Sequence, residues 1–452
     1  MTHIPMTRPD LMLTENLSVH HHSAFVELSD GRILQASGRR FSISQDGGLT
    51  WSEPFQRRDK NGGPVGGGGS SLVNLDGNSI GLAAIGGSEE PTPDETLQER
   101  IARQERGRMS AHMAFWRSDD GGETWEAPVR VTPEGLKCQA LHDVLMRTSS
   151  GRLVLPVFLL LGKNTGPYEE KPPSPGTLVN GQFINVTSHW FDPHGPSCVS
   201  VYYSDDDGRT WVPNHDGEVV LLLDWNATYS YVAEPTVTEV TPGTLLMLMR
   251  NQLGRLFQAW SYDNAETWTR PQPTSLAAGT TPAQVRTLDS GHILVVWNQE
   301  GEEDIKRGMS RQRMSSAISR NGGSVWEFFQ NIESAIEGTR VEPGPIKRQQ
   351  PEDVYFLPGK PAPERDPVHI VPGKRRGIWS YPSVLTLPDR VIVSYGYIRY
   401  EEHPTRAHWT TSVNEEPGYR TKIKVLPLNW FYGGKEPADN PFLPRAHEPA
   451  SP

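Results

Sequence analysis

Short apolar runs recur in pairs along the chain, and each pair is joined by a polar turn. Each pair predicts a strand, a turn of two to four Gly, Asp, Ser or Pro residues, and a second strand. Six such hairpins occur, at residues 27–34, 74–80, 148–155, 240–247, 288–295 and 387–394. Only residues 95–106 have the pattern of a helix, which we expect to be an excursion from the strands. The pattern therefore predicts an all-β fold.

A second pattern, S-x-D-x-G-x-T-W, follows each of the first five hairpins. It is intact from Ser44, Ser118 and Ser204, and altered from Ser261 and Ser319. The Asp bonds its own downstream backbone, the Gly accepts a positive φ, and the Trp anchors the resulting turn. A β-sandwich gives no reason for a fixed turn after each hairpin, and an α/β fold needs helices between its strands. The two repeats together predict a six-bladed β-propeller.

Length and composition fit one closed domain. The chain has 452 residues, and its 13 Trp, 43 Gly and 39 Pro suit a fold of many turns with aromatic anchors. We expect residues 1–452 to form a single propeller domain. Residues 327–376 are rich in Pro, Gly and charge. We expect them to be an insertion between blades five and six, forming a lid or a contact in a homo-oligomer.

Charge and cysteine content narrow the class of partner. The formal net charge of −10, without a basic stripe, argues against nucleic-acid binding. Residues 1–17 lack a signal-peptide pattern, and the longest apolar run, 153–161, is too short to cross a bilayer. Cys138 and Cys198 form no metal-binding pattern and are expected to be free thiols. The sequence therefore predicts a cytoplasmic protein without membrane contact, metal or other cofactor.

Aligning the six hairpins shows which side chains should converge on the propeller axis. Nine residues before each turn position lie His22, Gly68, His142, Glu234, Pro282 and Tyr381. The innermost strand of each blade runs beside the central channel, so equivalent positions form a ring at one mouth. One His at a strand start is more often structural than catalytic. Two His, a Glu and a Tyr in one ring predict a site for proton-transfer or nucleophilic chemistry.

The repeated turns resemble the Asp-boxes of the BNR/sialidase-like superfamily, whose enzymes are six-bladed propellers. The resemblance covers about residues 18–330 and 375–430. In that family a Glu of the fourth blade assists a Tyr nucleophile of the sixth, and three arginines hold the carboxylate of sialic acid. The segments AEPTVTEV and WSYPSVLTL resemble the strands carrying these two residues. The resemblance therefore implies that Glu234 is the base and Tyr381 the nucleophile.

The same resemblance assigns two of the three arginines. LLMLMRNQ supplies Arg250, and SRQRMSSAISR supplies Arg313, with Arg311 as a close rival. The position of the first family arginine is held by His21, in HHSAFVEL. The loop that carries the family's acid/base Asp has no counterpart, because ASGRRFSISQDGG runs almost directly into the first box.

The residue types suit cleavage of a glycosidic bond, which needs a proton donor and either a nucleophile or an activated water. Without the family's acid loop, His142 or His22 becomes the candidate proton donor, and Asp143 is expected to raise the pKa of His142. Arginines are planar partners for a carboxylate. Pairing of Arg250 with Glu234 for structure alone is the alternative.

We therefore predict a glycoside hydrolase that cleaves a terminal acidic sugar. His21, Asp143 and Asn298 are expected to contact the sugar, although Asn298 equally suits the capping of a strand end.

Two other functions remain open. In a polysaccharide lyase, a His and a Tyr would remove the C5 proton of a uronic acid and protonate the leaving oxygen, and the product would absorb ultraviolet light through its new C=C bond. In a non-catalytic carbohydrate-binding propeller, the ring would only seat a ligand.

Overall fold

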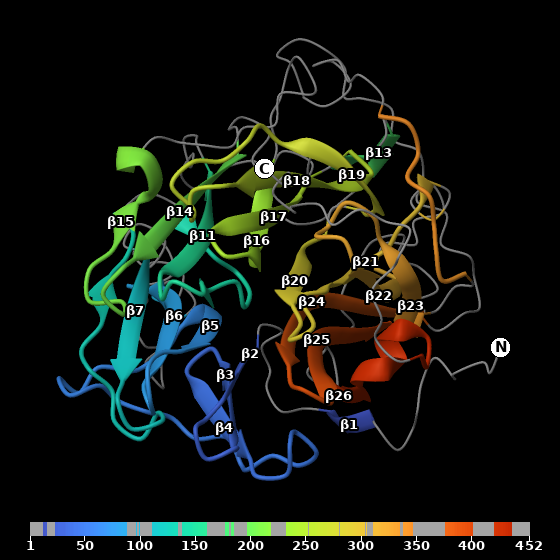
Figure 1. Cartoon of the computed structure of the whole chain (residues 1–452). Coiled ribbons are helices and arrows are strands. Elements are labelled where there is room, and N and C mark those ends of the chain that lie inside the picture. The colour runs from blue at the N-terminus through green and yellow to red at the C-terminus, as the bar shows by residue number, and fades with distance from the viewer. Residues whose placement is uncertain are drawn as a thin grey trace.

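The structure is a computed structural model in which the blades of a propeller surround a central axis in chain order (Figure 1). The all-β six-bladed prediction is confirmed. The structure describes residues 12–15, 23–87, 96, 99, 111–133, 138–160, 177–179, 182–184, 197–217, 232–251, 253–279, 281–302, 304, 311–334, 338–346, 376–400 and 420–435. The predicted helix at 95–106 falls largely outside these residues.

Blades two, four and five each contain four antiparallel strands, ordered from the axis outward. Blade two consists of β5 (Gly68–Asn74), β6 (Ile80–Gly86), β7 (His112–Ser118) and β8 (Val129–Arg130). Blade four consists of β16 (Ala233–Thr241), β17 (Thr244–Arg250), β18 (Arg255–Ser261) and β19 (Gln272–Ala277). Blade five consists of β20 (Ala283–Thr287), β21 (Ile293–Asn298), β22 (Arg313–Ser319) and β23 (Glu327–Ser334). The insertion expected at 327–376 therefore begins later, because its first residues pair with β22 as β23. Residues 347–375 of that insertion lie outside the described part of the chain.

Blades one and three differ in their outer strands. Blade one contains β2 (Ala24–Glu27), β3 (Ile33–Ser37) and β4 (Arg40–Ser44). Blade three contains β10 (Met146–Arg147), β11 (Leu153–Leu160), β14 (Ser197–Ser204) and β15 (Val212–Pro213), with β9 (Cys138–Gln139) also paired with β11. The short pair β12 (Thr177–Val179) and β13 (Gln182–Ile184) stands apart from the blades. Two 3-10 helices, η2 (Asn214–Gly217) and η3 (Leu428–Tyr432), complete the elements of the described residues, and no helix among them has the length and hydropathy of a membrane span.

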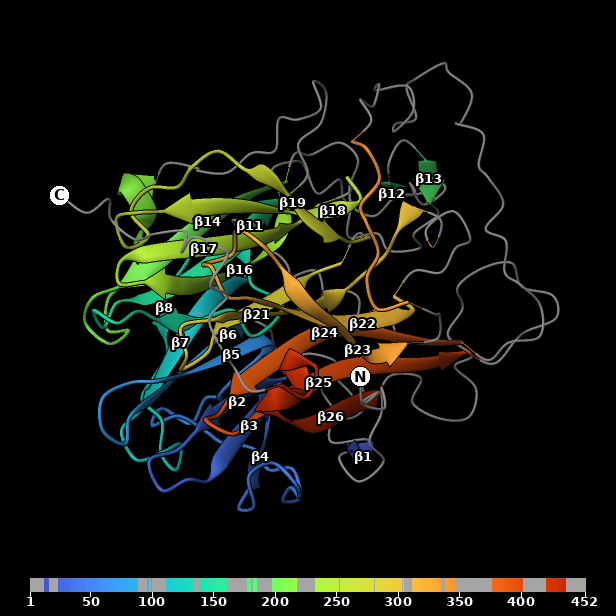
Figure 2. The same ribbon diagram turned by 45° about the vertical axis from the view of Figure 1, so that its right-hand side comes forward.

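Blade six joins the two ends of the chain. It contains β24 (Arg376–Thr386), β25 (Arg390–Tyr400) and β26 (Arg420–Pro427), and its fourth strand is β1 (Met12–Glu15), antiparallel to β26. β24 and β25, with 11 residues each, are the longest strands described (Figure 2). A strand from the start of the chain thus completes the last blade and closes the ring.

The second strand of blade four is apolar without alternation because neighbouring blades cover both of its faces. β17 shows this in the segment LLMLM. Leu245, Met247 and Met249 pack against blade three, whereas Leu246 and Leu248 pack against blade five. Side chains alternate between the two faces of a strand, and burying each one contributes roughly 1.5–3 kcal/mol.

The Asp-box turns have one repeated geometry. In the second box, Asp120 accepts the backbone N–H of Thr124 at 2.8 Å and its hydroxyl at 2.6 Å. Trp125 Nε1 donates to the carbonyl of Gly122 at 3.0 Å. The boxes from Ser44 and Ser204 repeat these bonds within 0.1 Å. The Asp side chains of the boxes therefore stabilise the turns through hydrogen bonds, and their role is structural, as the sequence predicts.

Each intact box packs against the preceding blade. A Cβ built on Gly208 would lie 2.0 Å from Phe115 of blade two, and one on Gly48 would lie 2.5 Å from Ile392 of blade six. Both glycines also have a positive φ, 83° and 94°. Only glycine satisfies both conditions, so the boxes hold neighbouring blades together around the ring.

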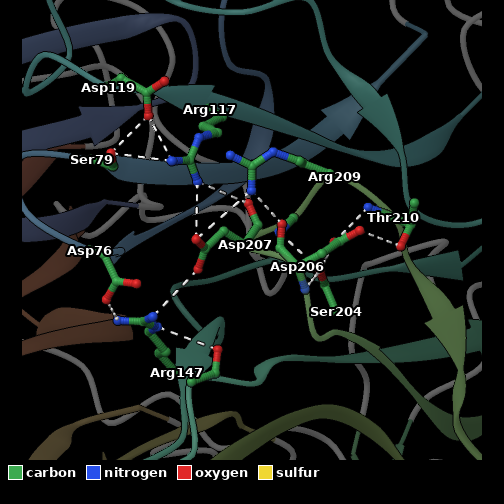
Figure 3. A network of polar contacts seen from close by, with 12 residues as sticks. Asp76, Ser79, Arg117, Asp119, Arg147, Ser204, Asp206, Asp207, Arg209 and Thr210 are labelled. Atoms are coloured by element: carbon green, nitrogen blue, oxygen red, sulfur yellow. Dashed lines mark hydrogen bonds and ion pairs between the residues drawn. The ribbon is translucent and has the colours of Figure 1, made fainter.

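Ion pairs reinforce the contact between blades two and three. Arg117 of β7 lies 2.7 Å from Asp119 and 3.6 Å from Asp207, which belongs to the third Asp-box turn. Arg147 forms ion pairs with the same Asp207 at 3.4 Å and with Asp76 at 2.8 Å (Figure 3). These side chains lie near the surface, and such exposed pairs contribute up to about 1 kcal/mol each. We interpret the network as structural.

Candidate functional site

Glu234 and Tyr381 lie on two innermost strands, Glu234 near the start of β16 and Tyr381 at the middle of β24. At both places the strand bulges, so that two residues face one on the partner strand. Both residues have a left-handed backbone, with φ of 44° and 54°. A proline follows each of them, which a bulge tolerates because the residue needs no ladder hydrogen bond there.

The two side chains meet directly. Tyr381 Oη donates to Glu234 Oε1 at 2.7 Å, and Arg250 pairs with the other carboxylate oxygen. Arg250 Nη1 also lies 3.5 Å from Tyr381 Oη. Arg250 reaches the pair because β17 places it opposite Ala233, the residue before Glu234. The side chains of Glu234 and Arg250 are each only 4% exposed.

The surroundings set opposite protonation states for the two partners. Burial alone would raise the pKa of Glu234, but the charge of Arg250 and the hydrogen bonds from Arg250 and Tyr381 outweigh it and leave the pKa lowered. Burial raises the pKa of Tyr381, and the negative charge of Glu234 raises it further. The resting pair is therefore an ionised carboxylate that accepts a hydrogen bond from a neutral phenol, which is the arrangement of a nucleophile with its base.

Of the two candidate arginines in the segment after β21, Arg311 is the one beside Tyr381. Its guanidinium carbon lies 5.4 Å from the centre of the tyrosine ring. Arg313 is buried and donates to the carbonyl of Gln299 at 3.1 Å, and it forms an ion pair with Asp304 at 3.1 Å. The geometry therefore favours Arg311 over Arg313 as the second arginine of the site.

His142 contacts Tyr381 but is poorly suited to donate a proton. Its ring meets that of Tyr381 edge-on, with centroids 6.2 Å apart. Complete burial lowers the pKa of His142 to about 4, against the opposing influence of Glu234. Nε2 lies 3.1 Å from the carbonyl of Ala283, which can only accept, so the neutral ring carries its proton on Nε2. The expected imidazolium at position 142 is therefore not favoured near neutral pH.

Asp143 joins four blades instead of facing a ligand. Its Oδ2 accepts Arg286 Nη2 of blade five and Ser383 Oγ of blade six, both at 3.1 Å. Its Oδ1 accepts the backbone N–H of Leu72 in blade two at 3.3 Å. Burial raises its pKa to about 6, although Arg286 and Ser383 act against this rise. The sequence assigned Asp143 to the sugar and to His142, but its bonded partners are these other residues.

The side chain of Asn298 also bonds the protein backbone. It is fully buried at the end of β21, and its Nδ2 donates to the carbonyls of Arg313 at 3.2 Å and Trp379 at 2.9 Å. Both amide hydrogens are thus used, so the strand-end role is the one that the geometry supports.

His21 and His22 lie outside the described residues, so their expected roles stay predictions. At the ring position of blade two, Gly69, with a φ of 66°, occupies the bulge, one residue after the predicted Gly68.

Within the described part of the chain, no three His, Cys, Asp or Glu side chains form a group able to hold a metal ion. Arg286, which binds Asp143, was not predicted as a site residue, although it is a charged residue on the innermost strand β20, AQVRT.

Comparisons with known proteins agree with this architecture. A curated sialidase of Bacteroides fragilis (strain YCH46) is 29% identical over 170 residues, which cover 37% of this chain and 24% of the relative. The match thus spans about a quarter of that relative's length.

Two solved structures share the fold. The Hadza microbial sialidase Hz136 superposes with a TM-score of 0.50 at 16% identity, over 93% of this chain and 67% of the other. A protein of unknown function from Dyadobacter fermentans superposes with a TM-score of 0.52 at 16% identity, over 94% and 100%.

The family comparison covers more of the sequence. The model of the BNR repeat-like domain matches residues 97–398, from the second blade into the sixth. With the six blades, the Asp-box turns and this match in agreement, the chain belongs to the BNR repeat-like domain family and is a sialidase-like propeller.

Proposed function

We propose that this chain is a glycoside hydrolase that removes a terminal acidic sugar with Tyr381 as nucleophile and Glu234 as its base. The observation that carries the proposal is the 2.7 Å hydrogen bond from Tyr381 Oη to Glu234 Oε1. The distant sialidase relative and the sialidase-like fold support the same class of reaction.

In this mechanism Tyr381 Oη forms a bond to the anomeric carbon as the glycosidic C–O bond breaks. The phenol proton passes to Glu234, and the leaving oxygen takes a proton from His22, because His142 is neutral. Water then attacks the anomeric carbon and gives a proton to His22, while the bond to Tyr381 Oη breaks and Glu234 returns its proton to the phenol, so that the sugar is released. A neutral phenol avoids the repulsion that a carboxylate nucleophile would exert on an anionic sugar.

Arg250 and Arg311 are proposed to hold the sugar carboxylate, since both lie against Tyr381. A guanidinium offers two parallel N–H donors to a carboxylate, which fixes the sugar as well as binding it. His21 would supply a hydrogen bond where a third arginine is absent.

A screen of aryl glycosides and acidic polysaccharides with the wild type and Tyr381→Phe tests the proposal. We expect release of an acidic monosaccharide by the wild type and its loss in Tyr381→Phe. Activity that survives Tyr381→Phe would overturn the assigned nucleophile. A product with ultraviolet absorbance from a new C=C bond would show a lyase, and binding without turnover would show a binding propeller.

A further inference from the structure

The strand that carries Tyr381 is tied to blade five through both backbone polar groups of Trp379. The N–H of Trp379 donates to the carbonyl of Arg311 at 3.1 Å, and its C=O accepts Asn298 Nδ2 at 2.9 Å. Trp379 stands two residues before Tyr381 on β24 and is nearly buried, with 7% exposure. These two bonds therefore set where the part of β24 just before Tyr381 lies relative to blade five.

The side-chain amide of Asn298 donates two hydrogen bonds at once, which few other side chains of its size can do. Its two amide hydrogens point at two carbonyls, those of Arg313 and Trp379. Among the described residues, its Oδ1 is buried without a hydrogen-bond partner. Leaving a buried acceptor unsatisfied is unfavourable, so the two hydrogen bonds that the amide donates must offset that cost.

The segment after Trp379 needs such support. Tyr381 has a φ of 54°, and the register of β24 against β25 shifts between Ser380 and Ser383. A non-glycine residue in this conformation persists only where its surroundings hold it. A bulge that relaxed would move the phenol away from Glu234.

We propose that Asn298 is a positioning residue for Tyr381, acting through the carbonyl of Trp379 to hold the bulge that presents the phenol to Glu234. The catalytic consequence rests on the proposed function, whereas the geometric consequence does not. A direct contact of Asn298 with sugar is disfavoured by its complete burial and by the use of both amide hydrogens.

The neighbouring Gln299 offers a matched control. It is equally buried, but its Nε2 donates to Ser315 Oγ at 3.1 Å and to the carbonyl of Thr339 at 3.0 Å. Neither of these partners belongs to β24. Substituting Leu at either position removes a buried amide, but only Asn298→Leu removes the bond to the strand of Tyr381.

We expect Asn298→Leu to lower kcat by roughly 10- to 100-fold with KM unchanged, because a small displacement of a reacting group carries such a penalty. Both variants should lower the melting temperature, Gln299→Leu at least as much because its Oε1 also accepts the N–H of Val341, but Gln299→Leu should keep kcat. Equal losses of kcat in both variants, or a rise in KM alone for Asn298→Leu, would overturn the inference.

Asn298→Asp provides a second, nearly isosteric test. A protonated Asp keeps one donor for the Trp379 carbonyl, whereas an ionised one faces two carbonyl oxygens. We expect kcat of this variant to fall with rising pH more steeply than kcat of the wild type, with no such additional fall in Gln299→Glu. A pH profile of kcat identical in both variants would contradict the role.

A crystal structure of Asn298→Leu separates this inference from the proposed function. We expect the bond of 2.7 Å between Tyr381 Oη and Glu234 Oε1 to be lost in that variant and kept in Gln299→Leu. An intact bond in Asn298→Leu would refute the positioning role whatever the activity. Loss of the bond in a protein that cleaves no glycoside would refute only the proposed function.

Discussion

Glu234 and Tyr381 have the same left-handed backbone conformation, at the same bulge of two innermost strands, and each is followed by proline. In blade two the equivalent bulge is occupied by Gly69. A non-glycine residue in such a conformation costs of order 1–3 kcal/mol. The fold thus contains a recurrent position that suits glycine, and in blades four and six that position carries the two side chains of the candidate site.

The bonded pair should behave as one catalytic unit. We expect Glu234→Gln to lower kcat by about 10²–10⁴-fold, because Tyr381 then loses the base that accepts its proton. The double variant with Tyr381→Phe should be no slower than Tyr381→Phe alone, since the two residues act in one step. Steady-state kinetics of the three variants measure this, and multiplicative losses would contradict a shared step.

The bulge of blade two gives a stability prediction. A Cβ on Gly69 would lie 1.9 Å from the backbone oxygen of Ala140, whereas one on Gly77 would meet nothing within 4 Å. Both have a similar φ, 66° and 65°. Gly77→Ala should cost about 1–2 kcal/mol from backbone strain alone, and Gly69→Ala roughly 1–3 kcal/mol more from the clash. Urea unfolding compares the two, and equal losses would show that the clash is relieved by movement.

The repeats made the propeller predictable, because both the hairpins and the Asp-boxes have local sequence signatures. The offset before each turn also identified Glu234, His142 and Tyr381, since the innermost strands repeat with nearly constant length. The same offset placed the ring position of blade two one residue too early, because the hairpin of that blade differs in length. The closure of blade six by β1 was not predicted, since the four residues of β1 have no signature of their own.

Contacts between distant segments were the least predictable part of the site. Arg311 and Arg313 both fit the family segment, and the choice depends on the left-handed φ of Arg311 and on Asp304, which pairs with Arg313. Likewise, the buried hydrogen bonds of Asp143 join segments up to 240 positions apart in the chain. A local sequence pattern cannot predict a contact between segments so far apart in the chain.

The two arginines should differ in their effect on binding. Arg311→Met is expected to raise KM for an acidic sugar glycoside by about 10- to 100-fold, through loss of a charge-assisted bond of roughly 1.5–3 kcal/mol. The methyl ester of the same substrate should show little change. Arg313→Met should lower stability, since it removes the ion pair with Asp304, and should leave the ratio of KM between the acid and its methyl ester unchanged. A larger ratio change in Arg313→Met would instead support the assignment made from sequence.

Asp143 gives a pH-dependent prediction for stability. Its pKa rises from 3.8 to about 6 in the fold because burial disfavours the charged form. A carboxyl with a raised pKa contributes stability below its unfolded pKa and loses it as the pH rises through the folded pKa. The wild type should therefore lose roughly 3 kcal/mol relative to Asp143→Asn between about pH 4 and pH 7, at ~1.4 kcal/mol per pKa unit. Chemical denaturation of both proteins across this range measures the difference, and a constant difference would contradict the raised pKa.

The sequence of the first blade leads us to expect weak activity on ordinary sialosides. His21 stands at the position of the family's first arginine, and a neutral imidazole offers a hydrogen bond without a charge. Loss of one charge-assisted contact costs roughly 1.5–3 kcal/mol, which is about ten- to a hundredfold in recognition of the carboxylate. The missing acid/base loop should lower turnover by a further factor of about 10²–10⁴ unless His22 compensates.

Assays on aryl sialosides test this expectation, with His21→Arg as the variant and His20→Arg as the control. We expect little turnover by the wild type, and a lower KM for the sialoside in His21→Arg only, because an arginine at position 21 restores the absent charge. Wild-type turnover near ~10 per second, an ordinary enzymatic rate, would show that the first blade recognises sialic acid without that arginine. An equal gain in His20→Arg would show that added positive charge, and not its placement, improves binding of the anionic sugar.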